Sequence, residues 1–143
     1  MATQAQRRES TRAAVVQAAV ESLVEGGVSG FTAADVAVRA AVSNGSVFRY
    51  FPTLTDLLAA TVESVFAGLS QEYVMRYAAL SSPVVTPRLL LALLWDVFND
   101  PAVAAVYEVY AAARTDPKLR SAIEPMIREH VDVIDQLGRR ILA

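Results

Sequence analysis

The sequence predicts an all-α fold. Apolar residues recur at spacings of three and four along almost the whole chain, which is the period of a helix with one buried face. The alternation typical of strands is rare. Glycine pairs, and capping residues followed by proline, divide the chain into segments of helical length. These observations together predict a chain built from consecutive helices.

The composition excludes several classes of protein. The 143 residues carry 13 basic and 15 acidic side chains, no cysteine and one histidine, His130. Disulfides, thiolate zinc sites and multi-histidine sites are therefore excluded, and we expect no metal and no cofactor. The polar N-terminus lacks the apolar core of a signal peptide, and no apolar run reaches the length of a membrane span. We therefore expect a soluble, cytoplasmic protein.

Two imbalances in the composition bear on function. Residues 1–51 hold five arginines and four acids, whereas residues 52–143 hold eight bases and eleven acids. The N-terminal part is thus weakly basic and the remainder acidic. Hydrophobic residues make up 54% of the chain, more than the interior of so small a protein can hide. This excess indicates a buried partner surface, an apolar cavity, or both.

The first helix is predicted from about Thr11 to Glu25, after a flexible arm formed by residues 1–9. Ser10 is a possible N-cap of this helix. Gly26-Gly27 ends it, because glycine readily adopts the left-handed conformation found at helix ends. Its buried face is formed by Val15, Ala18, Ala19 and Leu23.

Two short helices separated by a tight turn follow. The stretch from Thr32 to Asp35 resembles a capping box at the start of the second helix. The turn Ala41-Val42 leads to a third helix, for which Ser43 is the N-cap. Phe51 ends the third helix, because Pro52 disfavours helical geometry in the residue before it.

The remaining helices have equally clear boundaries. A long fourth helix is predicted from about Leu54 to Leu80, with Thr53 as its cap and Ser81-Ser82-Pro83 as its break. Three further helices begin with a capping residue followed by proline, which is well suited to the first helical position. These starts are Thr86-Pro87, Asp100-Pro101 and Asp116-Pro117. Pro125 should kink or split the last helix.

Two short helices joined by a tight turn form a helix-turn-helix, whose second helix reads base edges in the major groove of DNA. In the third helix, Gly45 and Arg49 point away from the side that packs on the protein. Arg49 could bind guanine in a bidentate manner, and Gly45 would let the backbone approach closely. Phe48 could contact a thymine methyl group or fold into the core. The candidate DNA-binding residues are Arg12, Thr32, Ser43, Asn44, Gly45, Ser46, Phe48, Arg49 and Tyr50.

A wider pattern extends over about residues 10 to 60 without a gap. It comprises Thr11-Arg12, Ala18-Ala19, Gly27, Thr32, Asp35-Val36-Ala37, Ala40, Val42-Ser43, the run from Val47 to Pro52, and Leu57-Leu58. This pattern resembles the N-terminal signature of TetR/AcrR transcription regulators. The resemblance implies a DNA-binding domain over residues 1–52 and a helical effector-binding and dimerisation domain over residues 53–143. It further implies a homodimer that binds operator DNA as a repressor and is released by a small effector.

The effector site is expected among the aromatic residues of the second half, because ligand sites between helices are mostly apolar and aromatic. Each of these residues could instead belong to the plain core. His130 and Tyr107 could supply polar anchors, and Glu108 is expected on a solvated face. The candidate ligand-binding residues are Phe66, Tyr73, Tyr77, Trp95, Phe98, Tyr107 and Tyr110.

Some residues depart from the family pattern. Ala41 replaces the usual glycine of the turn, at a cost of about 1 kcal/mol if the left-handed conformation is kept. Phe48, Asn44 and Leu54 lack phosphate-binding groups that are frequent in the family. This loss predicts weaker or less salt-sensitive DNA binding. Arginines of the N-terminal arm could compensate, namely Arg7, Arg8 and Arg12.

Two other functions are compatible with parts of the sequence to different degrees. The departures and the acidic charge favour a helical protein-interaction module that has lost DNA binding. An enzyme is not expected, because no nucleophile and base, glycine-rich phosphate loop or metal-ligand spacing is present. The chain ends at Ala143, earlier than most members, which indicates an unusual dimer or a shortened chain. No motif in the sequence identifies the operator, the effector or the target genes.

Overall fold

The computed structural model describes residues 3–79 and 86–142, and the regular structure of these residues is entirely helical. The all-α prediction is therefore confirmed for the described part of the chain. The helices are α1 (Gln4–Gly30), α2 (Ala33–Arg39), α3 (Asn44–Tyr50), α4 (Leu54–Ala78), α5 (Pro87–Phe98), α6 (Pro101–Ala113) and α7 (Pro117–Leu142).

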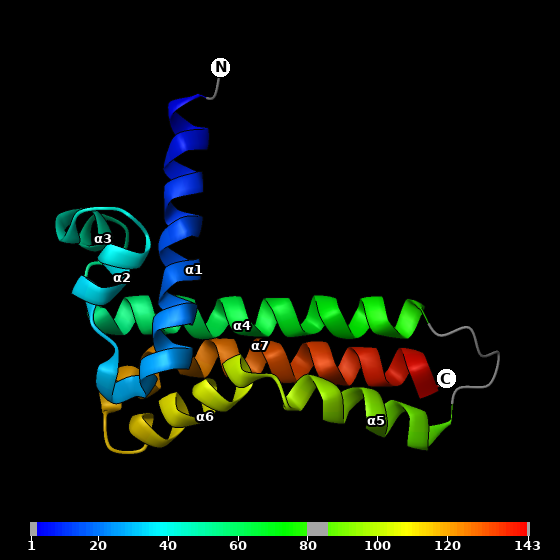
Figure 1. The fold of residues 1–143 in the computed structure, drawn as a ribbon. Coiled ribbons are helices and arrows are strands. Elements are labelled where there is room, and N and C mark those ends of the chain that lie inside the picture. Colours follow the sequence, from blue (N-terminus) through cyan, green and yellow to red (C-terminus); the bar gives the residue numbers. More distant parts are fainter. Residues whose placement is uncertain (1–2, 80–85, 143) are drawn as a thin grey trace.

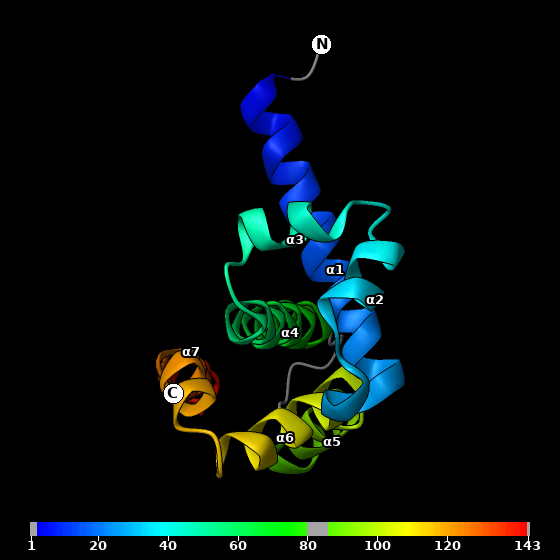
Figure 2. The same cartoon turned by 90° about the vertical axis from the view of Figure 1, so that its left-hand side faces the viewer.

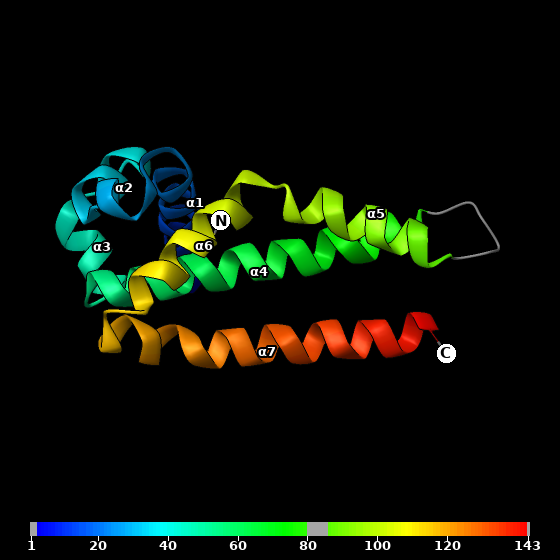
Figure 3. The same ribbon diagram turned by 90° about the horizontal axis from the view of Figure 1, so that it is seen from below.

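The long helix α4 separates two groups of helices. Helices α2 and α3 lie on one side of it, together with the N-terminal half of α1, and α5 to α7 lie on the other side (Figures 1 and 2). Helix α7 runs beside α4 along much of its length (Figure 3). Helix α1 crosses α4, and its C-terminal end packs against α6. Helix α1 therefore connects the helix-turn-helix directly with the C-terminal helices.

One hydrophobic cluster extends through both groups of helices. Val15, Val36 and Val47 of the first three helices are completely buried. Val62 of α4 and Val109 of α6 are buried to the same degree. The helix-turn-helix and the C-terminal helices therefore share one core.

The prediction of a flexible arm is wrong for the residues from Gln4 onward, which already belong to α1. A capping box begins the helix: Thr3 Oγ1 accepts the N–H of Gln6 at 3.2 Å, and the Gln6 side chain accepts the N–H of Thr3 at 2.6 Å. Ser10 therefore lies inside the helix and is not its cap. At the other end the prediction is confirmed, since the helical geometry is interrupted at Gly27, where φ is +62°.

The predicted caps of the next three helices are confirmed. Thr32 accepts the N–H of Asp35 and Ser43 accepts the N–H of Ser46, each at 3.1 Å. Thr53 and Asp56 form a complete capping box at the start of α4. Helix α4 ends at Ala78, and the predicted break at Ser81-Ser82-Pro83 lies outside the described residues.

The three C-terminal helices begin at the predicted prolines, after Thr86, Asp100 and Asp116. Helix α7 continues through Pro125 and is not split there. Pro125 is exposed, so water can satisfy the backbone carbonyl that loses its partner. In the described part of the chain no helix alone is long and apolar enough to cross a membrane. Only α5 and α6 taken together meet that test, and they are bent by 71°.

Candidate nucleic-acid interface and ligand pocket

Helix α3 is held on one side by buried residues and presents the other side to solvent. Val47 is completely buried and Phe51 is 3% exposed. On the opposite side Gly45 and Arg49 are exposed, as the helical spacing predicts. The ring of Phe48 is 41% exposed, so it does not fold into the protein's own core. The exposed side of α3 therefore carries two large side chains, those of Phe48 and Arg49, beside Gly45.

The space above Gly45 is open. A Cβ atom at this position would approach only the Ser43 side-chain oxygen, at 4.0 Å. Packing within this chain therefore does not require glycine there. The absence of a side chain leaves the backbone of α3 accessible to a large partner.

The other candidate DNA-binding residues surround this face. Ser46 and Tyr50 are half-buried, and Tyr50 packs against the core. The Arg12 guanidinium lies over the ring of Phe51, with its carbon 5.3 Å from the ring centroid. Helix α1 is thereby joined to the end of α3. The candidates that are exposed are Arg12, Thr32, Ser43, Asn44, Gly45, Phe48 and Arg49.

The turn between α2 and α3 contains a strained residue. Ala41 has a φ of +54°, and no other non-glycine residue of the described ranges has a positive φ. Its N–H donates to the Val38 carbonyl at 3.2 Å, and the N–H of Val42 donates to the Ala37 carbonyl at 3.0 Å. The left-handed conformation is thus kept at Ala41, which meets the condition for the cost given above, and the two bonds hold the turn between α2 and α3.

One ion pair joins α2 to the end of α1, and a second lies within α2. Arg39 donates to Asp35 and to Glu25, each at 2.8 Å. The hydrogen bond and positive charge of Arg39 lower the pKa of Glu25. Arg39 is therefore engaged within the protein.

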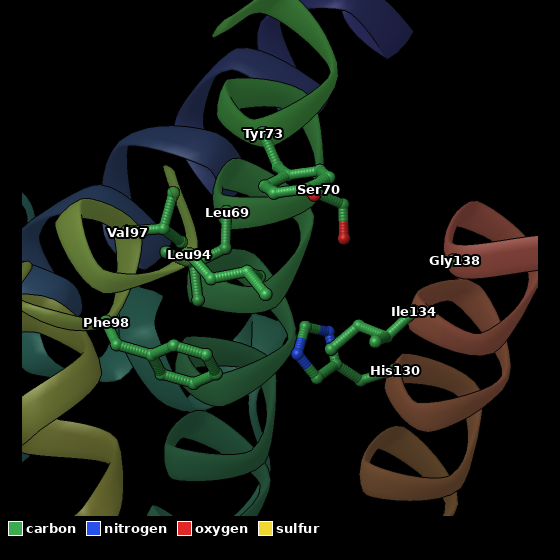
Figure 4. A pocket seen from close by; sticks show the side chains of 9 residues that line it. All are labelled: Leu69, Ser70, Tyr73, Leu94, Val97, Phe98, His130, Ile134 and Gly138. Carbon is green, nitrogen blue, oxygen red and sulfur yellow. The ribbon is translucent and has the colours of Figure 1, made fainter. Parts of the chain in front are cut away.

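A small cavity lies between α4, α5 and α7, with a volume of about 110 Å³. Side chains from all three helices converge on it (Figure 4). The described lining residues include no carboxylate and only three polar side chains, those of Ser70, Tyr73 and His130. The described lining residues are Leu69, Ser70, Tyr73, Leu94, Val97, Phe98, His130, Ile134 and Gly138.

His130 is the central polar group of this cavity. It reaches from α7 toward α4 (Figure 4) and stacks on Phe66, with ring centroids 4.0 Å apart and planes inclined by 13°. Burial lowers the pKa of His130. The imidazole is therefore neutral at pH 7, where it can both donate and accept a hydrogen bond.

The predicted aromatic residues divide into three groups. Tyr73 and Phe98 line the cavity. The ring centroids of Phe66 and Tyr110 lie 6.3 Å apart, and Phe66 stacks on His130. Burial and the neighbouring Tyr107 raise the pKa of Tyr110 to about 12. The remaining three residues do not line the cavity, and Trp95 is 69% exposed. They are Tyr77, Trp95 and Tyr107.

Sequence reasoning did not select most of the apolar lining residues. Leu69, Leu94, Val97 and Ile134 carry no signal that distinguishes a cavity wall from an ordinary core position. The usable signals were the aromatic residues Tyr73 and Phe98, and His130, because a histidine among apolar residues requires a polar partner.

Glu108 is exposed, as expected for a solvated face, and it also joins α6 to α1. Its side-chain oxygen Oε2 accepts the N–H of Val28 at 3.2 Å. A Cβ atom at Gly27 would lie 2.5 Å from the same oxygen. The break in α1 therefore needs glycine for its positive φ, and a side chain at this position would displace the Glu108 carboxylate from Val28.

Comparisons with known proteins agree with this architecture. Residues 15–61 match the family described as bacterial regulatory proteins, tetR family. An uncharacterised HTH-type transcriptional regulator of Mycobacterium tuberculosis is 32% identical over 139 residues, which cover 97% of this chain and 71% of the relative. The chain belongs to the TetR family. The HTH-type transcriptional regulator CymR of Pseudomonas putida is 30% identical over 98% of the chain and 69% of its own length.

Solved structures of TetR-family proteins share the fold. The multidrug binding protein EbrR complexed with ethidium superposes with a TM-score of 0.65 at 25% identity, covering 92% of this chain and 87% of EbrR. EbrR complexed with imidazole gives a TM-score of 0.63 at 29% identity, over 82% and 67% of the two chains. The TetR-family match begins in α1 and ends in α4, so it includes the whole helix-turn-helix.

Proposed function

We propose that this TetR-family chain is a sequence-specific repressor that binds operator DNA and is released by a small, mostly apolar effector. The observation that carries the proposal is the outward face of α3, on which Arg49 and Phe48 flank the open backbone at Gly45. Residues 1–52 form the DNA-binding part and residues 53–143 the effector-binding and dimerisation part. A protein with this role works where the DNA is, in the cytoplasm.

In this proposal α3 lies in the major groove. Arg49 reads guanine through two parallel hydrogen bonds, and the Phe48 ring meets a thymine methyl group. Gly45 allows the helix to lie close to the base edges. Side chains around the face position the protein on the phosphates and carry no sequence information themselves. They are Arg12, Thr32, Ser43, Asn44 and Ser46.

Two copies of the chain read two half-sites, which are about 34–36 Å apart on the DNA. Exposed apolar side chains on the C-terminal helices support a dimer, because monomers seldom expose many large apolar residues close together. Trp95 on α5 and Val131 on α7 are 69% and 58% exposed.

The effector occupies the cavity between α4, α5 and α7. A cation gains no carboxylate partner among the described lining residues, so a neutral, mostly apolar compound with one hydrogen-bonding group toward His130 fits best. The present volume of about 110 Å³ is below the roughly 300–1,000 Å³ of sites for drug-sized ligands. A larger effector must therefore move α7 away from α4.

Movement of the C-terminal helices can reach the DNA-binding part through α6. The hydrogen bond from Val28 to Glu108 and the shared core connect α6 with α1. Helix α1 in turn contacts the end of α3 through Arg12 and Phe51. Effector binding would change the orientation of α3 by this route and release the operator.

The proposal is tested by selecting genomic DNA fragments with the purified protein at near-physiological salt. We expect enrichment of a pseudo-palindrome that disappears in the variant Arg49→Ala. Arg88→Ala, which removes an exposed arginine from α5, is the matched control and should retain the enrichment. No enrichment by the wild type, or the same enrichment in Arg49→Ala, would contradict the proposal.

A specific observation supports a second candidate function, a protein-interaction module without DNA binding. Large apolar side chains are exposed on the helix-turn-helix itself, including Val38 at 80%. This alternative predicts that the wild type selects no sequence even at low salt, so repeating the selection at low salt distinguishes the two functions.

A further inference from the structure

We propose that the N-terminal turns of α1 form a second DNA contact, which binds phosphates of the duplex beside the bases read by α3. This inference rests on the proposed function. It concerns residues 4–11, which precede the stretch matched to the family. The partner is recognised by its chemistry, a regular array of phosphate charges next to the operator half-site.

The first argument is the position of these turns. Residues 4–10 are exposed on all sides, and the first completely buried residue of α1 is Val15. The helix projects past α3 on the same side of α4 in both Figure 1 and Figure 2. Seven residues at 1.5 Å each give about 10 Å of free helix, which spans about three base pairs at 3.4 Å per pair. Such a projection has no packing role within the chain.

The second argument is the charge of the projection. Residues 4–12 contain Arg7, Arg8 and Arg12 against the single acid Glu9, so their net charge is +2, whereas the whole chain has a charge of −2. Within the ranges that the structure describes, Arg7 and Arg8 form no ion pair. Their guanidinium groups are therefore free to bind phosphate.

The third argument is the face on which the arginines lie. Arg12 sits over Phe51, the residue that ends α3, so this side of α1 faces the recognition helix. Arg8 is four residues earlier and lies on the same face, one turn further out. A stripe of positive charge thus leads from the end of α3 along α1. Phe51 lies on the packed side of α3, so the stripe reaches the C-terminal end of α3 rather than its face with Arg49, and it would bind phosphates beside the half-site.

The fourth argument is preorganisation. The capping box of Thr3 and Gln6 stabilises the projection as a helix before DNA is bound. A disordered arm would lose conformational entropy when it bound, whereas a preformed helix avoids most of that loss. The arginines of α1 therefore offset the phosphate-binding groups missing at Asn44 and Leu54.

The test measures affinity of the full chain for its selected operator as a function of salt, using long flanks on both sides. In Arg7→Ala/Arg8→Ala, the loss of two phosphate contacts should reduce the salt slope by about 1.8 for each protomer. At 0.15 M salt this change corresponds to about 30-fold weaker binding per protomer, if both proteins bind equally at 1 M. The base preference should not change, because these contacts carry no sequence information.

Two further variants make the test specific. Arg88→Ala/Arg114→Ala removes the same charge from exposed positions on the other side of α4 and should keep the wild-type slope. Arg7→Lys/Arg8→Lys preserves the charge and should keep most of the slope. An unchanged slope in Arg7→Ala/Arg8→Ala, or an equal loss in the charge-matched control, would overturn the inference. If the wild type selects no sequence, the proposed function itself fails, so the two failures are distinguishable.

Discussion

Replacing Ala41 by glycine should stabilise the protein. Ala41 occupies the turn between α2 and α3 with a φ of +54°. Residues other than glycine adopt this conformation only at a cost in free energy. Its side chain is exposed, so the substitution removes little buried surface. The hydrogen bonds that fix the turn are made by backbone atoms and remain in Ala41→Gly.

The magnitude follows from two opposing terms. The left-handed conformation costs an L-residue about 1–2 kcal/mol. Glycine increases the entropy of the unfolded chain, which costs about 0.4–1 kcal/mol. The difference between the two terms is about 0–1.6 kcal/mol, so the free energy of unfolding should rise by about 0.8 kcal/mol. For a chain of this length the melting temperature should rise by about 2–4 °C.

The assay is urea unfolding followed by circular dichroism. Ala14→Gly is the matched control, because Ala14 is exposed in the middle of α1 and glycine in a helix interior costs about 1 kcal/mol. The two substitutions should thus have opposite signs. If Ala41→Gly destabilises the protein as much as Ala14→Gly does, the strain assigned to this turn is refuted.

Three other perturbations test separate contacts by unfolding measurements. Glu108→Ala should lower the free energy of unfolding by about 1 kcal/mol, because the N–H of Val28 loses its acceptor. Glu108→Gln should lower the free energy of unfolding less. Equal losses in the two variants would contradict the role of this hydrogen bond. Ser43→Ala should cost about 1 kcal/mol by removing the cap of α3, and Ser43→Thr should retain most of the stability; a neutral Ser43→Ala would show that the cap is dispensable. Because burial lowers the pKa of His130 in the folded state, the unfolded chain binds the proton first, and stability should fall as the pH drops below about 6.5. His130→Phe should weaken this pH dependence, and an identical pH profile would refute the assignment.

Local chemistry explains why most helix boundaries could be predicted from the sequence. A cap and a proline act within three or four residues, so Thr86-Pro87 and Asp100-Pro101 define the starts of α5 and α6 without reference to the rest of the fold. The start of α1 was missed for a related reason. Residues 4–10 have no buried face, so hydrophobic periodicity could not reveal a helix that depends on its capping box.

The ligand cavity could be predicted only as a class of site. Whether Trp95 or Leu94 faces the cavity depends on how α5 rotates against α4 and α7, and both residues suit a buried helix face equally well. The contact between Val28 and Glu108 joins residues 80 positions apart. No local pattern records such a contact, because it arises only when α1 and α6 pack together.

The most direct test of the central claim is the ratio of affinities for the selected operator and for a scrambled duplex. A bidentate contact to guanine contributes about 1–3 kcal/mol of discrimination. In Arg49→Ala we therefore predict that this ratio falls by roughly 5- to 150-fold for each half-site, while binding to the scrambled duplex changes far less. A ratio equal to that of the wild type would contradict the assignment of α3 and Arg49 as the reader of the operator.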